Sequence, residues 1–289
     1  MELKRVVVTG LGAITPLGNT LAETWEGLIN GKSGAGPITH FDASKFKTHF
    51  ACEVKGFDPL EVMDRKEARK CDRYSLLAIS AAKQAVADAA MDLENENKDR
   101  IGVIFAAGIG GIRTFEEEVA SYEKTKDTIG PKFNPFFIPK MIADIAAGHI
   151  SMMYGFRGPN FATVSACASS TNAIADAFNY IRLGKANAIV TGGAEAAIAA
   201  PGLGGFNAMN ALSTRNESPE TASRPFSASR DGFVMGEGAA CLILEEMEHA
   251  LARGAKIYGE IVGAGMSADA HHLTASHPEG LGAKLVMKN

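Results

Sequence analysis

Short apolar runs alternate with longer segments of helical periodicity along this chain. Six runs have the length and apolar composition of buried strands: 5–9, 101–106, 161–165, 188–191, 239–244 and 256–262. Five segments carry apolar residues at helical spacing: 21–29, 74–90, 140–153, 169–183 and 245–253. Central strands with so few polar residues are typical of a sheet that is covered on both faces. The alternation therefore predicts an α/β layered fold with mostly parallel strands.

Two stretches interrupt this pattern. Segments 117–139 and 200–230 are rich in Gly, Pro, Asn and Ser, and we expect them to be long and irregular. Loops of such length in a compact domain are usually functional or interfacial. The segment 169–183 contains small residues on several sides, so we expect a central helix there, with Gly184 at its C-terminal cap.

One cysteine lies where this pattern would place a nucleophile. Cys167 follows the apolar run 161–165 and directly precedes the predicted central helix. Free backbone N–H groups and the helix dipole favour an anion at a helix N-terminus, so a thiol there loses its proton more easily. The resulting thiolate is the reactive form. A small buried core cysteine is the alternative, but the small flank Ala168-Ser169-Ser170 leaves room for a substrate at the sulfur.

Composition narrows the class of protein. The 289 residues are 46% hydrophobic and 21% charged, which predicts a globular protein of one large or two smaller domains. A net charge of −4 gives no general attraction to nucleic acid or to an anionic membrane. No apolar run is long enough to span a bilayer, and residues 1–5 lack the features of a signal segment. The four cysteines show neither metal-ligand spacing nor disulfide density, so we expect a reducing cytoplasm and no metal.

Two glycine-rich segments invite a cofactor-binding interpretation. Gly10 and Gly12 follow a predicted strand, but Thr15 and Pro16 break the pattern of a dinucleotide-binding loop. We expect a tight turn above the sheet instead. Gly108-Ile-Gly-Gly111 follows the strand 101–106 without the Lys-Ser/Thr pair of a phosphate loop. Its glycines are expected to let the backbone approach another backbone or a ligand closely, with Ile109 lining a pocket.

A pair of histidines leaves two interpretations open. His271 and His272 lie in the run Asp269-Ala-His-His-Leu-Thr274. One of them would serve as a base for Cys167, or both would be ordinary loop histidines. A metal site would need a third ligand, which the spacing does not supply.

A basic segment also has two interpretations. If residues 63–70 are helical, Arg65 lies with Arg69 along one face, and Lys66 lies with Lys70. Such a face on an acidic protein would dock an acidic partner. The alternative is a solvated surface helix.

Taken together, the motifs resemble those of the β-ketoacyl-[acyl carrier protein] synthases of fatty acid synthesis, in particular the elongating type II enzymes. The resemblance runs along the whole chain. It rests on the opening 5–19, Gly108-Ile-Gly-Gly111, Gly158-Pro159, the run around Cys167, Gly192-Gly-Ala-Glu195, 211–215, 223–225 and 230–238. It implies a homodimer with a thiolase-like αβαβα sandwich built from two related α/β halves. Residues 1–254 would form the complete N-terminal half, and 255–289 the start of a truncated C-terminal half.

The resemblance also implies a reaction, with no cofactor. Members of this family are acyltransferases that catalyse a decarboxylative Claisen condensation between an acyl thioester and malonyl-acyl carrier protein. Cys167 would first take the acyl chain in a ping-pong scheme. Carbon dioxide would then be released, and the product would be a 3-oxoacyl-acyl carrier protein that is two carbons longer. The backbone N–H of Cys167 would form one arm of the oxyanion hole.

The same resemblance assigns roles to further residues. Phe233 would lie beside the malonyl site, and Ile109 and Phe206 would line the acyl pocket. His272 and Thr274 would lie near the pantetheine entrance, which argues against His272 as the catalytic base. The basic face would dock the acidic carrier protein through Arg65, Lys66, Arg69 and Lys70.

The chain departs from the family pattern in three respects. Ser227 stands where many members have aspartate, and Asn210 where relatives often have an arginine near the carrier entrance. The family also continues past Asn289, into a part that supplies two histidines, a lysine and a Gly-Phe-Gly-Gly loop. We therefore expect the chain by itself to be a poor condensing enzyme.

Two other functions compete with this one. The first is a catalytically incomplete homologue that acts as a binding or dimerisation partner, although such partners lack the cysteine that this chain retains. The second is a thiolase or a starter-type synthase using coenzyme A substrates. The opening segment and the run 230–238 speak against the second.

Overall fold

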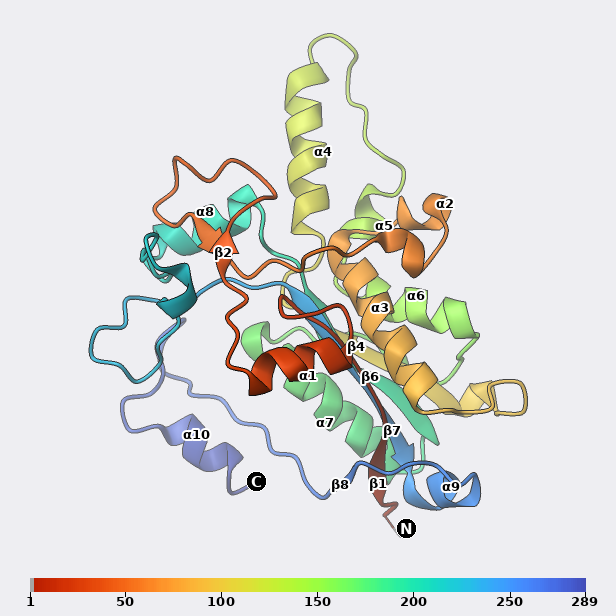
Figure 1. Cartoon of the computed structure of the whole chain (residues 1–289). Helices are drawn as coiled ribbons and strands as arrows, with labels where there is room; N and C mark the ends of the chain where they lie inside the picture. Colours follow the sequence, from red (N-terminus) through yellow and green to blue (C-terminus); the bar gives the residue numbers. More distant parts are fainter. Residues whose placement is uncertain (1–2) are drawn as a thin grey trace.

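The computed structural model describes residues 3–289. Its centre is a six-stranded sheet, which Figure 1 shows between the helices. The strands follow the order β5-β4-β6-β7-β1-β8. Their bounds are β1 Val6–Ile14, β4 Ile101–Ala106, β5 Asn160–Phe161, β6 Ala188–Glu195, β7 Gly238–Glu246 and β8 Gly259–Ile261. A separate two-stranded ribbon pairs β2 (Gly36–Pro37) with β3 (Phe50–Ala51). Five of the six predicted strands are present, and β4 has the predicted bounds. The strand predicted over 161–165 is only the two-residue β5, and residues 162–165 form a loop.

The prediction of a mostly parallel sheet is wrong. Strand β4 runs parallel to both β5 and β6, but the pairs β6–β7, β7–β1 and β1–β8 are antiparallel. A parallel neighbour needs a crossover that returns the chain to the starting end of the sheet. The connection between β6 and β7 stays at one end, so β7 runs back along β6. Strand β5, which leads to Cys167, lies in the parallel part of the sheet.

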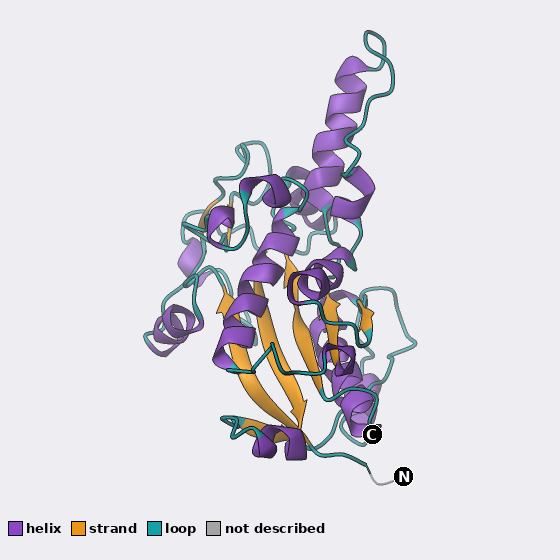
Figure 2. Cartoon of the chain, turned by 90° about the vertical axis from the view of Figure 1, so that its right-hand side faces the viewer, coloured by secondary structure: helices purple, strands orange, loops and turns teal. Residues whose placement is uncertain are grey.

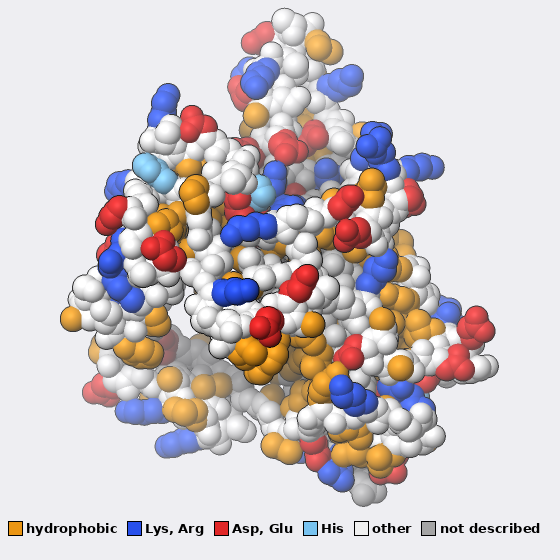
Figure 3. Space-filling view, viewed as in Figure 1, with side chains coloured by type: hydrophobic (Ala, Val, Ile, Leu, Met, Phe, Trp, Pro, Cys, Tyr) orange, Lys and Arg blue, Asp and Glu red, His pale blue; other side chains and the backbone are white. Residues whose placement is uncertain are grey.

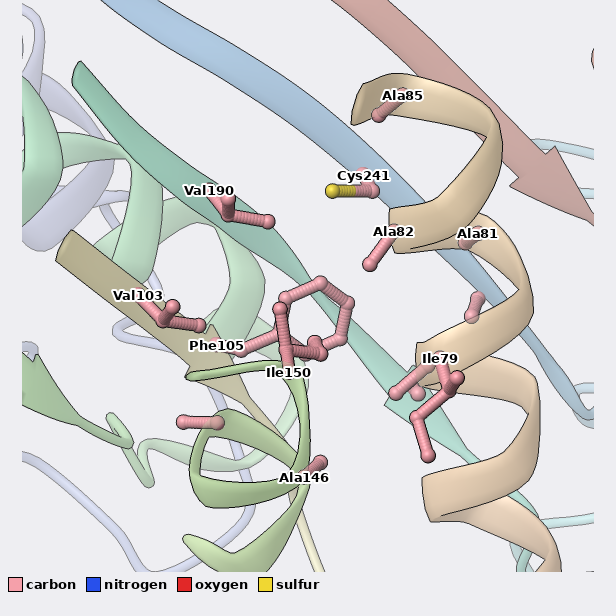
Figure 4. Close-up of a cluster of buried hydrophobic side chains, with 14 of the residues drawn as sticks. Ile79, Ala81, Ala82, Ala85, Val103, Phe105, Ala146, Ile150, Val190 and Cys241 are labelled. Atoms are coloured by element: carbon pink, nitrogen blue, oxygen red, sulfur yellow. The ribbon is translucent and has the colours of Figure 1, made fainter. Parts of the chain in front are cut away.

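Helices cover both faces of the sheet, and α4 projects from one end (Figure 2). Along β4 the side chains alternate between the faces, as a strand requires. Val103 and Phe105 pack with α3 (Arg73–Asp88) and α6 (Ile145–Tyr154), as Figure 4 shows. Ile104 and Ala106 pack on the other face with α7 (Ser169–Arg182). The result is an α/β/α layered core with α7 in the predicted central position.

The tight turn expected within residues 9–18 is present, but Gly10 and Gly12 are not part of it. Both lie inside β1, and the turn follows later, between Thr15 and Gly18. A Cβ added to Gly10 would lie 2.2 Å from the carbonyl oxygen of Ala85, and one on Gly12 would lie 2.1 Å from that of Ala81. The glycines are needed because the backbone of β1 approaches α3 this closely.

The remaining helices surround this core. They are α1 (Leu21–Ile29), α2 (Arg65–Ala68), α4 (Ile112–Thr125), α5 (Phe137–Met141), α8 (Ala200–Ala208), α9 (Met247–Ala252) and α10 (Leu281–Val286), with short 3₁₀ turns η1 (Pro59–Glu61), η2 (Lys98–Arg100), η3 (Ala166–Ala168) and η4 (Pro219–Thr221). Helix α1 has its predicted bounds because Thr20 and Glu23 form a reciprocal capping box.

The structure differs from the sequence prediction in three longer segments. The stretches expected to be irregular contain most of α4, part of α5 and all of α8, and the helix expected over 140–153 is divided between α5 and α6. Gly184 follows α7 with a left-handed φ of 67°, as expected for a C-terminal cap. Within residues 3–289, no helix is long and apolar enough to cross a membrane.

Candidate active site

Cys167 lies at a sharp turn between a strand and a helix. It occupies η3, which follows β5 and leads directly into α7, and its side chain is exposed. The preceding residue, Ala166, has a φ of 51°, which is uncommon for a residue with a Cβ. No side-chain hydrogen bond caps the start of α7 in the described chain. The N–H groups of Ala168 and Ser169 are donated within the turn, to the carbonyl oxygens of Ser165 and Ala166. The dipole of α7 still favours an anion near the sulfur.

A small hydrogen-bond network holds this turn. The buried Ser169 hydroxyl accepts the N–H of Ser165 at 2.8 Å and donates to the carbonyl oxygen of Ala166 at 2.7 Å. Asn172 donates its Nδ2 hydrogen to the hydroxyl of Ser165 at 2.7 Å, and Thr163 donates its hydroxyl to the carbonyl oxygen of Ser169 at 2.8 Å. These hydrogen bonds, from residues before and after Cys167, hold the backbone of Ala166 in its unusual conformation.

The strain at Ala166 gives a testable prediction. Ala166→Val is expected to destabilise the fold by about 1–3 kcal/mol, because a β-branched side chain tolerates a left-handed φ poorly. Ala168→Val is the matched control, since Ala168 is also exposed in the same turn but has a φ of −88°. Urea unfolding of both variants measures the difference. Equal stability of the two variants would contradict this account.

The glycine-rich loop after β4 lies against the turn. A Cβ added to Gly108 would lie 3.6 Å from the carbonyl oxygen of Ala166. A Cβ on Gly111 would lie 2.4 Å from the carbonyl oxygen of Lys140, so the interpretation of these glycines as close-approach residues is confirmed. Ile109 lies in this loop and is 45% exposed. The loop that carries Ile109 therefore lies beside the turn that carries the cysteine.

Glu195 holds the same loop and was missed as a functional residue. It lies at the end of β6, and its Oε2 accepts the N–H of Gly108 at 3.0 Å and that of Ile109 at 2.7 Å. Burial raises the pKa of the Glu195 carboxyl, while these N–H groups act in the opposite direction. The available signal was an acidic residue at the carboxyl end of an apolar strand, where α/β folds place their sites.

Two predicted aromatic residues meet in the structure. Phe206 in α8 and Phe233 in the loop before β7 have ring centroids 5.2 Å apart, in an edge-on arrangement. Phe233 exchanges backbone hydrogen bonds with Ala211 and Ser213. Phe206 packs against the same apolar cluster as Ile112, which follows the Ile109 loop directly. These contacts connect the two rings to the end of the sheet where β4 and β6 terminate.

A buried ion pair supports the Phe233 loop, and sequence reasoning missed it too. Arg73 donates to both carboxylate oxygens of Glu237, at 2.8 Å and 2.6 Å, and His40 lies 3.2 Å from the same carboxylate. Burial opposes ionisation of Glu237, but hydrogen bonds from His40 and Arg73 and the Arg73 charge lower its pKa to about 2. A glutamate between two glycines in the run 230–238 was the only sequence signal.

His272 and Thr274 lie in the exposed loop between β8 and α10. The ring Nδ1 of His272 accepts the N–H groups of Thr274 and Ala275, each at 3.1 Å. Within residues 3–289, neither residue hydrogen-bonds to the turn that carries Cys167. The described residues also contain no cluster of His, Cys, Asp and Glu that would hold a metal ion.

The predicted basic face lines a groove. Asp64 caps α2, and the groove of about 1070 Å³ lies between α2, the C-terminal half of α4 and the loop that follows α4. Figure 3 shows Lys and Arg side chains in blue in this part of the molecule. Lys132 and the ring of Phe136 lie across from α2, and the Lys70 ammonium lies 5.6 Å from that ring. The groove is lined on the α2 side by Arg65, Lys66, Arg69 and Lys70.

The fold and the cysteine turn together define a ketosynthase. A solved β-ketoacyl synthase from Burkholderia phymatum has a TM-score of 0.87 and 33% identity, covering 99% of this chain and 70% of that one. A solved ketosynthase in complex with the acyl carrier protein of a type II polyketide system has a TM-score of 0.88, 31% identity and 99% coverage of this chain. The predicted thiolase-like fold is confirmed.

The sequence comparisons identify the family. The model described as "Beta-ketoacyl synthase, N-terminal domain" matches residues 3–250, and the chain belongs to this family. A Synechocystis relative named 3-oxoacyl-[acyl-carrier-protein] synthase 2 is 51% identical over 98% of this chain and 67% of its own length. A relative of the same name from Coxiella burnetii is 47% identical over 100% of this chain and 69% of its own. The chain thus spans about two thirds of the length of these relatives.

Proposed function

We propose that this chain is a 3-oxoacyl-[acyl carrier protein] synthase, an acyltransferase of fatty acid elongation. The observation that carries the proposal is the exposed Cys167 at the N-terminus of α7, in a chain 51% identical to a synthase of that name. The non-catalytic alternative is not favoured, because the structure presents the sulfur for reaction instead of burying it.

In the first step, the Cys167 thiolate attacks the thioester carbonyl of an acyl-carrier protein. The new carbon–sulfur bond forms as the carrier thiolate leaves and takes up a proton. The backbone N–H of Cys167 and the N-terminal end of α7 stabilise the negative oxygen of the intermediate. In the second step, malonyl-carrier protein loses carbon dioxide, and the resulting carbanion attacks the acyl carbonyl. The carbon–sulfur bond breaks, and the 3-oxoacyl product leaves on the carrier protein.

We infer that three apolar side chains line the substrate site. Ile109, beside the turn, and Phe206 would line the acyl pocket, whereas Phe233, in edge contact with Phe206, would face the malonyl group. His272 and Thr274 would lie near the entrance for the pantetheine arm. Apolar walls with few polar groups are typical of pockets for an alkyl chain.

The choice of acyl donor tests this function. The protein is incubated with octanoyl-carrier protein or with octanoyl-coenzyme A, and the intact mass is followed over time. We expect one octanoyl group to be added from the carrier protein, much faster than from coenzyme A at equal concentration. A faster reaction with coenzyme A would favour a thiolase or a starter-type synthase, and no mass gain from either donor would contradict the proposal.

We propose further that the groove beside α2 docks the acidic carrier protein. Four basic side chains of 65–70 and Lys132 line it on both sides and outnumber the acidic lining residue Glu118, so an acidic helix would meet a net positive charge. Complementary charge mainly accelerates association and is screened by salt.

Charge reversal in this groove gives a second prediction. The double variant Arg65→Glu/Lys66→Glu is expected to weaken carrier-protein binding by about tenfold or more at low salt, with a smaller effect at high salt. Lys284→Glu/Lys288→Glu, at the far C-terminal end, changes the net charge equally and should have little effect. Calorimetric titration measures both. An equal loss in the two double variants would indicate a general charge effect instead of a docking site.

A homodimer is proposed from the edge of the sheet. Strand β5 has one neighbour, β4, and the chain that follows it leaves Val164 62% exposed, three residues before Cys167. An unpaired edge of this kind can pair with the same edge of a second copy. Val164→Asp should shift the particle mass in analytical ultracentrifugation from dimer to monomer, whereas Val262→Asp, at another exposed valine, should not. A wild-type monomer would contradict the proposal.

We propose that the chain consists of one complete half and the start of a second, and that the protein is cytoplasmic. Residues 1–254 would form the first half and 255–289 the start of the second, which the family match over 3–250 supports. A cytoplasmic location is supported by the four free cysteines, since disulfides are rare in a reducing compartment.

A further inference from the structure

Glu195 is a partly buried carboxylate for which the proposed reaction has no use. It ends β6, a strand buried at almost every position, and it points at the backbone of the neighbouring loop. One oxygen, Oε2, accepts both the N–H of Gly108 and the N–H of Ile109. A single side-chain oxygen therefore fixes two consecutive residues of the loop that follows β4.

The loop is held from two directions. A Cβ on Gly108 would come within 3.0 Å of the Glu195 Oε2, so glycine admits the carboxylate at this distance. On the other side, Gly111 donates its N–H to the carbonyl oxygen of Met141 at 3.0 Å. The same Gly108 lies close to the carbonyl oxygen of Ala166. Glu195 therefore sets how the Ile109 side chain stands relative to the nucleophile.

We propose that Glu195 is a positioning residue that holds Ile109 and thereby determines which acyl chains Cys167 accepts. This inference rests on the proposed function. An acetyl group extends only two carbons from the sulfur, whereas a longer acyl chain has to pack against the apolar wall that includes Ile109. Without an acceptor, the N–H groups of Gly108 and Ile109 lose their partner, and the loop moves to find another. The transfer of a long acyl chain should therefore be slowed more than the transfer of a short one.

Glu195→Ala and Glu195→Gln test the proposal through chain-length selectivity. The rates of acetyl and octanoyl transfer from carrier protein to Cys167 are measured by intact mass. In Glu195→Ala, the ratio of octanoyl to acetyl rates is expected to fall about tenfold, the size of effect that small changes in an apolar pocket produce. Glu195→Gln should restore most of the wild-type ratio, because one amide oxygen can accept both N–H groups.

Glu53 offers a matched control. Its Oε1 accepts the N–H groups of two consecutive residues, Thr39 at 2.9 Å and His40 at 3.2 Å, in a loop apart from the cysteine turn. Glu53→Ala should leave the octanoyl-to-acetyl ratio unchanged. An equal loss of both rates in Glu195→Ala, or the same ratio change in Glu53→Ala, would overturn the inference. Failure of the wild type to accept either group would overturn the proposed function, and the inference with it.

Discussion

Cys167→Ala is expected to eliminate acyl transfer to the protein. Cys167 is the one exposed cysteine of the four, whereas Cys71 and Cys241 are buried. Burial raises the pKa of Cys71 to about 11, which leaves little thiolate at neutral pH. After incubation with octanoyl-carrier protein, intact mass should show one added acyl group on the wild type and none on the variant. The expected loss exceeds about a thousandfold, because no other group takes over a missing nucleophile.

Cys52→Ala serves as the matched control for this experiment. Cys52 is half-buried, and burial raises the pKa of its thiol, so its removal should leave acyl loading unchanged. Cys167→Ser should load far more slowly than the wild type, because a hydroxyl is a weaker nucleophile than a thiolate. If Cys167→Ala still takes up acyl groups, and this loading is lost only when Cys52 is also replaced, then Cys52 is the nucleophile and the assignment of Cys167 is wrong.

Local sequence signals were sufficient for much of the fold. The apolar run 101–106 and the helix 21–29 were predicted with their observed bounds, since a continuous apolar run and the helical spacing of apolar residues are local properties. The direction of the strands was not predicted correctly, because it depends on how the connection between β6 and β7 packs at one end of the sheet. The glycines of β1 were assigned to a turn for a similar reason. Their role depends on α3, which is distant in sequence but adjacent in space.

The residues of the candidate site also fall into two groups, those that local sequence could predict and those that it could not. Cys167 could be predicted because its flanking strand and helix signals are adjacent in sequence. Glu195 and Glu237 could not be given roles, because each acts on residues that are far away along the chain: the Gly108 loop for one and Arg73 for the other. A carboxylate inside an apolar segment indicates a buried partner, but the sequence does not specify which one.

Arg73→Ala is expected to destabilise the fold more than any other substitution proposed above. The Glu237 side chain is fully buried, and it would lose its guanidinium partner in this variant. Removing one member of a buried pair typically costs about 3–5 kcal/mol. His40 and the N–H of Val54 would still contact the carboxylate, but the full positive charge of the guanidinium would be lost. The exposed pair Arg157–Asp99 is the control, and Arg157→Ala should cost less than about 1 kcal/mol. Urea unfolding at neutral pH compares the two, and similar losses would contradict the argument.

The pH dependence of that loss provides an independent check. The pKa of Glu237 is lowered from 4.5 to about 2 in the folded protein, so its ionisation stabilises the fold above pH 4.5. This contribution is lost as the pH falls from 4.5 through 2, where the carboxylate takes up a proton. The difference in stability between the wild type and Arg73→Ala should therefore be constant near neutral pH and shrink across this acidic range. A difference that stays constant down to pH 2 would show that Arg73 contributes through packing and not through the charge of Glu237.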